Sequence, residues 1–405
     1  MKIRCLFGGI PIVNDKDLSA LFAEKFQCSH EKQFFAPGRI NLIGEHTDYN
    51  GGHVFPCAIT FGTYCFVKKR DDLNVRMYSV NFAEKGIIEF SLNNLDYQND
   101  HHWGNYPKGM LRFVRDSGYK IPNGFDVLFY GNIPNGAGLS SSASIEMLTG
   151  IMIDGLFQLE IPRLELVKLG QKVENEYIGV NSGIMDQFAV GMGRADSGIL
   201  LDCQTLDYEY APIQLENHKI IIMNTNKRRE LADSKYNERR SECEEALSDL
   251  QKELNIIALG QITEELFENS KHLIKNETVR KRAKHAVYEN QRTLKALQAL
   301  KNGNLEEFGA LMNASHNSLR DDYEVTGIEL DTLVEASWAQ QGVVGARMTG
   351  AGFGGCAIAI VEKDKVEDFI SEVGKAYKQK IGYAADFYVA SIGDGAKEIL
   401  NEVKL

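Results

Sequence analysis

The sequence predicts an α+β protein with two domains. Its 405 residues exceed what one ordinary hydrophobic core accommodates. The first half alternates apolar and polar positions between glycine turns, a pattern typical of antiparallel strands. The second half carries long amphipathic helical patterns instead. Because the composition changes near residue 212, we expect one domain at 1–212 and a second at 213–405.

The individual elements follow from periodicity. In the first half, strands are expected within 64–80, 124–134 and 198–203, and helices at 142–156 and 164–177. In the second half, a strand at 218–226 precedes a long polar helix at 230–254. Further helices are expected at 279–300, 305–319, 328–339 and 366–378, and strands beside a glycine loop within 344–361 and at 387–392.

Composition excludes several classes of protein. A net charge of -11 without a long basic run argues against nucleic acid or an anionic membrane as a partner. Seven cysteines without a C-x-x-C pair indicate free thiols rather than a disulfide framework or zinc site. No apolar run is long enough for a membrane span, and the first residues do not resemble a secretory signal. We therefore expect a cytoplasmic protein.

A glycine-serine loop, GNIPNGAGLSSSASIEM at 131–147, precedes the predicted helix at 142–156. Gly136 and Gly138 allow a tight turn, and Ser140, Ser141 and Ser142 lead into the helix. A helix N-terminus offers free N–H groups and positive potential to phosphate, and serine hydroxyls can reach a divalent cation. An ordinary capped helix after a glycine turn remains the alternative. The chain contains no Walker sequence G-x-x-x-x-G-K-[ST].

A second glycine-rich segment, GAGFGG at 350–355, matches the dinucleotide-binding pattern G-x-G-x-x-G. That pattern must open a helix, whereas CAIAIV at 356–361 is typical of a strand. We therefore expect a loop between strands, which can still contact a phosphate or a substrate.

Two acidic residues lie in contexts that differ from an ordinary surface. Asp186 sits among apolar residues after Ser182-Gly183, which makes it a candidate buried base. Glu174 lies in a predicted helix and is a suitable ligand type for Mg²⁺. A surface position remains the default for either carboxylate.

The segment RINLIGEHTDYNGGH at 39–53 begins as an apolar strand and ends in a polar cluster. Glu45, His46 and Asp48 would repel phosphates but accept hydrogen bonds from hydroxyl groups. Together with the glycine-serine loop, this cluster predicts phosphoryl transfer to a sugar hydroxyl. A polar turn after a strand is the alternative.

Three segments together resemble one family. APGRINLIGEHTDYNGGHVFPCAI, IPNGAGLSSSAS and RMTGAGFGGCAIAIV are similar to the three signature motifs of the GHMP small-molecule kinases. The EHTDYNGG core resembles the galactokinases in particular, as do VENEYIGVNSGIMDQF, SKYNERR and SLRDDYEVT. The similarity spans nearly the whole chain in family order, although the segment before Phe35 contributes little.

The resemblance implies ATP-dependent phosphorylation of galactose at its anomeric hydroxyl, with Mg²⁺. It also implies an N-terminal domain like the second domain of ribosomal protein S5 and a ferredoxin-like C-terminal domain. We expect only small-molecule partners, galactose and ATP, and a monomeric protein.

The resemblance also implies roles for individual residues. Asp186 matches the catalytic base and Arg39 its partner in stabilising the transition state. Whether Asp186 abstracts the proton or mainly orients the hydroxyl stays open. The remaining matched positions fall into three groups: sugar contacts Glu45, His46, Thr47, Asp48, Gly183 and Tyr236; ATP contacts Ser79, Gly136, Ala137, Gly138, Leu139, Ser140, Ser141 and Ser142; magnesium ligands Ser142 and Glu174.

The sequence leaves two alternatives to galactokinase activity. N-acetylgalactosamine kinase and arabinose kinase share these motifs. Galactose sensors of the same family bind ligands without catalysis, and they resemble the family with a deletion in the Ser-Ala part of the phosphate loop. Ser142-Ala143-Ser144 is intact here, which favours an enzyme.

Overall fold

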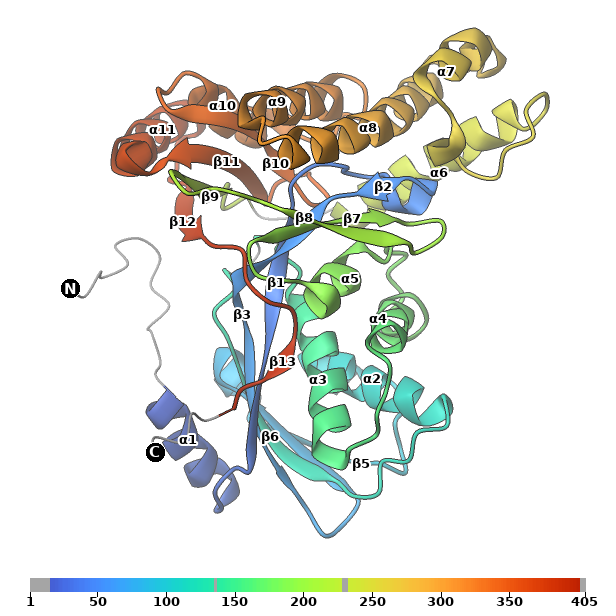
Figure 1. Ribbon diagram of the computed structural model, residues 1–405. Coiled ribbons are helices and arrows are strands. Elements are labelled where there is room, and N and C mark those ends of the chain that lie inside the picture. The colour runs from blue at the N-terminus through green and yellow to red at the C-terminus, as the bar shows by residue number, and fades with distance from the viewer. Residues whose placement is uncertain (1–14, 135–136, 228–231, 401–405) are drawn as a thin grey trace.

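The computed structural model describes residues 15–134, 137–227 and 232–400. A six-stranded sheet lies in the lower part of Figure 1. The strands lie in the order β13-β1-β3-β6-β4-β5. Their bounds are Lys397–Glu398, Lys32–Asn41, Pro56–Lys69, Phe125–Gly131, Asn74–Ser79 and Ile87–Ser91, in that order. Neighbouring strands are antiparallel except β4 and β6, which are parallel. The expectation of antiparallel strands is therefore wrong for this pair, because the chain crosses over through a helix before β6.

The two faces of this sheet bury different helices. Cys65 and Val67 of β3 point into a core formed with the helices on one face, whereas Phe66 between them packs with α1 on the other. Figure 1 shows α1 on its own side of the sheet. The helices are α1 (Asp15–Phe26) on that side, and α2 (Asn105–Asp116), α3 (Ser141–Phe157), α4 (Arg163–Lys172) and α5 (Met185–Met192) on the opposite side.

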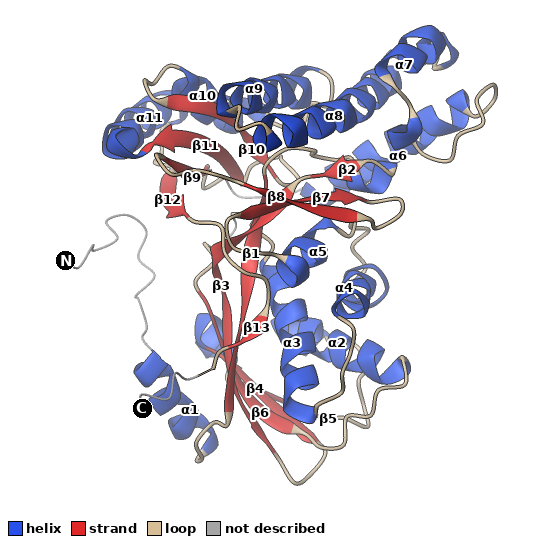
Figure 2. Ribbon diagram, in the orientation of Figure 1, coloured by secondary structure: helices blue, strands red, loops and turns tan. Residues whose placement is uncertain are grey.

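A second, four-stranded antiparallel sheet has the order β10-β11-β9-β12. Its strands are β9 (His218–Asn224), β10 (Val343–Thr349), β11 (Cys356–Glu362) and β12 (Asp386–Ala390). Ile221 and Met223 pack toward the helices, and Ile220 and Ile222 pack the other way. Figure 2 shows α8 (Glu277–Lys301), α9 (Leu305–Asp321), α10 (Gly327–Trp338) and α11 (Val366–Ile381) above this sheet. The helices α6 (Ala232–Leu250) and α7 (Glu264–Ser270) lie to the right of them in the same view.

The two sheets share a core, which fixes how the halves meet. Ile40 and Leu42 from β1 and the turn after it pack in one cluster with Ile222 and Ile358 of the second sheet. A small third sheet joins β2 (His53–Val54), β7 (Ser197–Asp202) and β8 (Tyr208–Pro212). The predicted boundary near residue 212 falls at the end of β8. The strand β13 then returns to the first sheet, so the division into 1–212 and 213–405 stays a prediction.

Most predicted elements are confirmed. The helix predicted at 164–177 continues from α4 into a π-helical turn at Val173–Ile178, and the helix predicted at 230–254 is described only from residue 232 and ends at 250. The helices α1, α2, α5 and α7 were not predicted from the sequence. The described cysteines are free thiols, while Cys5 lies outside the described residues. Within the described ranges, no helix is long and apolar enough to cross a membrane.

Candidate active site

A cavity of about 490 Å³ lies where the two halves meet. Most of the predicted site residues line it, although they come from segments far apart in the sequence. These are Arg39, Glu45, His46, Asp48, Gly138, Leu139, Ser140, Ser141, Ser142, Glu174, Gly183, Asp186 and Tyr236. The predicted contact Gly136 lies outside the described residues.

Arg39 and Asp186 form a two-pronged ion pair across 147 positions of sequence. The Arg39 Nε and Nη2 atoms each donate to a different Asp186 oxygen at 2.8 Å. The Nη1 atom donates to the Gly138 carbonyl at 2.8 Å, which ties the pair to the glycine-serine loop. Such a fork-to-fork contact fixes the orientation of the carboxylate as well as its position.

Asp186 is more accessible than the sequence predicts. It stands in the first turn of α5 among buried neighbours, but 27% of its side chain remains exposed. The Ser140 hydroxyl donates to its Oδ2 atom. A carboxylate held by two groups and open on its remaining side can meet a substrate hydroxyl.

The glycine-serine loop makes a sharp turn before α3. Gly138 and Ser140 both have positive φ angles, 72° and 62°. Gly38 of β1 passes so close that a Cβ there would lie 2.7 Å from the Leu139 carbonyl oxygen. The three serines then line the cavity at the N-terminus of a 17-residue helix. This arrangement suits phosphate, as the sequence predicts.

Glu174 and Ser142 form an oxygen-rich group at the cavity wall. Glu174 is 7% exposed, and its carboxylate accepts a hydrogen bond from the Ser182 hydroxyl at 2.6 Å. Burial raises the pKa of Glu174, while hydrogen bonds from the Ser182 and Ser142 hydroxyls act against that rise. Because Mg²⁺ takes one or two protein oxygens and completes its shell with water and phosphates, this pair fits it. In the described part of the chain, no three His, Cys, Asp or Glu side chains form a denser metal group.

The sugar-binding segment predicted at Glu45–Asp48 forms a tight turn after β1. Glu45 is 1% exposed, and its carboxylate accepts hydrogen bonds from the Asn41 side-chain amide at 2.6 Å and from the Gly350 backbone N–H. The Thr47 hydroxyl lies within 2.9 Å of the Gly44 carbonyl and 2.6 Å of the His53 carbonyl. Thr47 thus stabilises the turn and does not line the cavity.

Aromatic rings pack behind this turn. The His46 Nδ1 atom lies 2.8 Å from the Tyr49 hydroxyl, which lies 2.7 Å from the Tyr323 hydroxyl. Burial lowers the pKa of His46 to about 3, so its ring is neutral near pH 7. Tyr236 of α6 completes the group, with its ring centroid 5.6 Å from that of His46.

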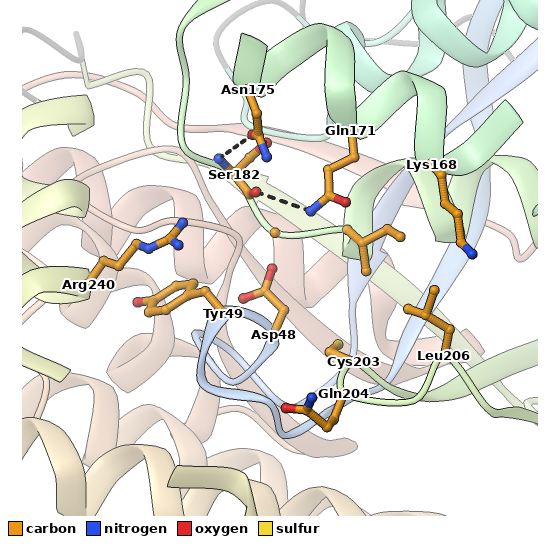
Figure 3. Close-up of a pocket in the computed structure, with 12 residues that line it drawn as sticks. Asp48, Tyr49, Lys168, Gln171, Asn175, Ser182, Cys203, Gln204, Leu206 and Arg240 are labelled. Carbon is orange, nitrogen blue, oxygen red and sulfur yellow. Dashed lines mark hydrogen bonds between the residues drawn. The ribbon is translucent and has the colours of Figure 1, made fainter. Parts of the chain in front are cut away.

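Asp48 and Gly183 line both the main cavity and a second one of about 400 Å³. Figure 3 shows the second cavity with Asp48 in its wall. A Cβ at position 183 would lie 1.8 Å from the Asp48 Oδ2 atom, so only glycine fits beside this carboxylate. Burial raises the pKa of Asp48 to about 6. Lys168, Gln171 and Arg240 also line the second cavity.

The remaining predicted positions differ in placement. Ser79 is buried at the end of β4, and neither it nor Ala137 lines the cavity. The segment at 350–355 is a loop between antiparallel β10 and β11, which confirms that it is no dinucleotide fingerprint. Gly350 and Ala351 of this loop line the cavity.

Comparison with known proteins agrees with this geometry. The model of the galactokinase galactose-binding signature matches residues 20–69, and the GHMP kinase N-terminal and C-terminal models match 105–194 and 296–379. A galactokinase of Exiguobacterium sibiricum is 62% identical over 96% of this chain and 100% of its own length. The chain belongs to the galactokinase family of GHMP kinases. The predicted two-domain α+β fold of that family is confirmed.

Further relatives of this galactokinase-family chain support the same placement. A galactokinase of Lactiplantibacillus plantarum is 61% identical over 96% of this chain and 100% of its own length. The structure of Lactococcus lactis galactokinase complexed with galactose matches 95% of this chain and 99% of that one, at 55% identity and a TM-score of 0.93. Methanococcus jannaschii mevalonate kinase, at 21% identity and a TM-score of 0.64, shares the fold.

Several residues of the site in this galactokinase-family chain were not predicted from the sequence. Tyr106 of α2 and Asn237 of α6 line the cavity, and Asn41 holds Glu45. Arg347 and Glu289 lie buried behind Glu45. Asn41 stands within a quoted motif and Arg347 within another, but neither residue has a sequence context that distinguishes it from its neighbours.

Proposed function

We propose that this chain catalyses the ATP-dependent phosphorylation of α-D-galactose at the C1 hydroxyl, giving galactose 1-phosphate and ADP. One observation carries the proposal. The Arg39–Asp186 pair stands in one cavity with the serine loop and with the acids Glu45 and Asp48. The relatives at 57–63% identity are named galactokinases, which supports the same reaction.

Asp186 accepts the proton of the C1 hydroxyl as that oxygen attacks the γ-phosphorus of ATP. The bond from the γ-phosphorus to the bridging oxygen breaks, and ADP leaves. Arg39 holds the Asp186 carboxylate with two hydrogen bonds and offsets negative charge in the transition state. Its guanidinium stays protonated, so it cannot serve as the base.

The two substrates meet groups of opposite character. Glu45 and Asp48 accept hydrogen bonds from sugar hydroxyls, with His46, Gly183 and Tyr236 completing the pocket. Thr47 supports them from within the turn. The ATP phosphates meet Gly138, Leu139, Ser140, Ser141 and Ser142 of the glycine-serine loop, which line the cavity.

Ser142 and Glu174 would hold Mg²⁺, which neutralises charge on the phosphate oxygens when bound. The Ser182 hydroxyl donates to the Glu174 carboxylate and so restrains its orientation. We further propose that the protein acts in the cytoplasm as a monomer, with galactose and ATP as its partners.

The test is ADP release with a panel of galactose, N-acetylgalactosamine, arabinose and glucose, in the presence of Mg²⁺ and ATP. We expect galactose to give the highest kcat/KM and the product to carry its phosphate on C1, as phosphorus NMR would show. Preference for the N-acetylated sugar would replace the proposed substrate. Galactose binding without ADP release would indicate a sensor instead of an enzyme.

A further inference from the structure

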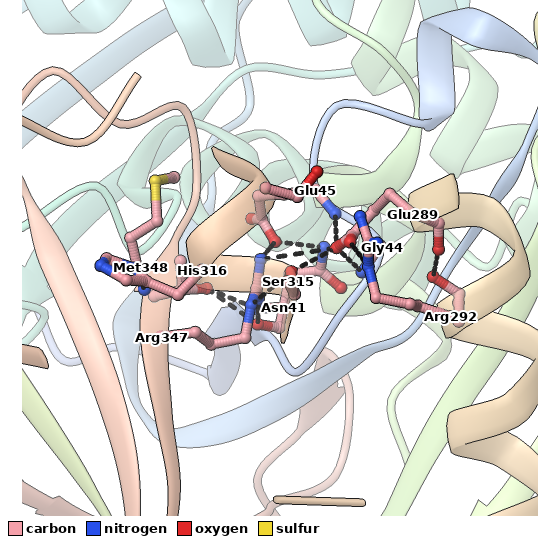
Figure 4. A network of polar contacts seen from close by, with 12 residues as sticks. Asn41, Gly44, Glu45, Glu289, Arg292, Ser315, His316, Arg347 and Met348 are labelled. Carbon is pink, nitrogen blue, oxygen red and sulfur yellow. Dashed lines mark hydrogen bonds and ion pairs between the residues drawn. The ribbon is translucent and has the colours of Figure 1, made fainter. Parts of the chain in front are cut away.

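A buried network of polar side chains lies behind the predicted sugar-binding turn at Glu45–Asp48 (Figure 4). Arg347 of β10 and Glu289 of α8 are both 0% exposed, as is Ser315 of α9. All three belong to the second half of the chain, whereas Gly44 and Glu45 belong to the first. The network therefore joins the sugar-binding turn to three elements of the other half.

The Arg347 guanidinium makes three directed contacts in this network. Its Nη2 atom donates to the Glu45 Oε2 atom at 2.9 Å. Its Nη1 atom donates to the Asn41 carbonyl at 3.0 Å, and its Nε atom donates to the Ser315 hydroxyl at 3.1 Å. Because the guanidinium is planar, these contacts fix the Glu45 carboxylate in one orientation.

Glu289 supports the backbone of the same turn. Its Oε1 atom accepts hydrogen bonds from the N–H groups of Gly44 at 3.0 Å and Glu45 at 3.2 Å. The same atom accepts a hydrogen bond from the Ser315 hydroxyl at 2.6 Å. Its Oε2 atom accepts from Arg292 at 2.8 Å. Although burial acts to raise it, the nearby cations lower the pKa of Glu289 to about 2, so this carboxylate is ionised near pH 7.

The contacts of Glu45 leave little of its carboxylate free. A carboxylate offers about four acceptor positions. Asn41, Arg347 and the Gly350 N–H occupy three of them. Because Glu45 also lines the cavity, about one acceptor position remains for a ligand hydroxyl. The direction of that acceptor depends on Arg347.

We propose that Arg347 and Glu289 are positioning residues for sugar recognition: Arg347 aims the Glu45 carboxylate, and Glu289 holds the backbone of the Gly44–Glu45 turn. Neither touches the substrate, so their loss weakens sugar binding and leaves ATP binding and the phosphoryl-transfer step largely intact. The proposal rests on the proposed function, because Glu45 must read a galactose hydroxyl for its orientation to matter.

The first experiment compares Arg347→Lys and Arg347→Met with wild type. Lys keeps the charge but loses the planar fork, and Met loses both. We expect the galactose KM to rise at least about tenfold in Arg347→Met, because a hydrogen bond to a charged group is weakened. A smaller rise is expected in Arg347→Lys, and the ATP KM should change less than about twofold in both, by the same reasoning.

The matched control is Arg76→Lys. Arg76 of β4 also holds a buried carboxylate, that of Asp126, with two hydrogen bonds of 2.7 Å, and it lines neither cavity described above. The Arg76→Lys substitution should lower thermal stability without changing the galactose KM. An Arg347→Met protein that folds and shows no larger rise in galactose KM than Arg76→Lys would overturn the proposal. An equal rise in both KM values would do the same.

Monodeoxygalactoses test the link to Glu45 directly. In Glu45→Gln, removal of one particular hydroxyl from the sugar should cost less affinity than it costs in wild type. Arg347→Lys should lose discrimination at that same hydroxyl, because it acts through Glu45. Loss of discrimination at another hydroxyl would contradict the proposal.

Two further measurements cover the cases in which the Arg347 variants do not fold or the wild type is inactive. If the Arg347 variants do not fold, Ser315→Ala removes only the hydroxyl between Arg347 and Glu289, and an unchanged galactose KM there overturns the proposal. If wild type forms no ADP from galactose, the proposed function fails. Calorimetric Kd values for galactose then test Arg347 with the same panel of variants.

Discussion

Replacing Gly183 by alanine should weaken galactose binding without unfolding the protein. A Cβ at this position would lie 1.8 Å from Oδ2, 2.4 Å from Cγ and 3.1 Å from Cβ of Asp48. These separations are too short for non-bonded atoms, and the atoms in conflict belong to one short side chain. The Asp48 carboxylate must therefore rotate away from its place beside the cavity.

The size of the effect follows from what Asp48 contributes. A hydrogen bond to a charged group is worth about 1.5–3 kcal/mol, and about 1.4 kcal/mol corresponds to a tenfold change in affinity. If Asp48 reads one galactose hydroxyl, Gly183→Ala should raise the galactose KM by about 10- to 150-fold. The ATP KM should remain within about twofold, because the serine loop is untouched.

Initial rates at saturating ATP measure this effect, and thermal unfolding monitors the fold. The control is Gly374→Ala in α11, where an added Cβ would find its nearest atom at an ordinary 3.4 Å, on Phe387. That variant should keep the wild-type galactose KM. A folded Gly183→Ala protein with a galactose KM within about twofold of wild type would refute the reading of Asp48 as a sugar contact.

Three further predictions concern acidic groups. Asp186→Asn should lower kcat at least about 100-fold while calorimetry still detects galactose binding, since a general base is lost; near-normal turnover would leave Asp186 with an orienting role only. Because the pKa of Asp48 is about 6, kcat/KM for galactose should fall as pH drops through 6 and Asp48 takes up a proton. That acid limb should be absent from Asp48→Asn, and an identical limb in the variant would assign it elsewhere. Burial raises the pKa of Glu146 well above its usual value, so folding retains a proton that the unfolded chain releases above about pH 4.5. Glu146→Gln should therefore raise Tm more at pH 8 than at pH 4, and an equal shift at both pH values would contradict this.

Local patterns allowed most of the fold to be predicted. A continuous apolar run identified β9, which buries both of its faces, and helical periodicity identified α8 and α9, which bury an apolar face against a core. The eight-residue helix α5 was missed because it is short and follows a glycine. The parallel pairing of β4 with β6 depends on the crossover through α2, which strand periodicity does not encode.

The candidate site was predictable to the extent that its residues lie in contiguous motifs. The segment holding Glu45 and Asp48 could be recognised from its unusual density of polar groups after an apolar strand. The pairing of Arg39 with Asp186 came from the family resemblance, since nothing local links positions 147 apart. Glu289 looks in the sequence like any charged residue of a polar helix, and only the fold reveals that it is buried.

Arg39 and Arg347 hold carboxylates that differ in exposure. Both are 5% exposed or less, and both hold a carboxylate. The partner of Arg39 keeps 27% of its side chain accessible, whereas the partner of Arg347 keeps 2%. An accessible carboxylate can exchange a proton with a bound hydroxyl, and a nearly enclosed one can only present a fixed acceptor. Burying an unpaired charge is costly, so the loss of either Arg347 or Glu45 alone would destabilise the fold. Because they come from opposite halves of the chain, we expect sugar recognition to depend on how those halves pack.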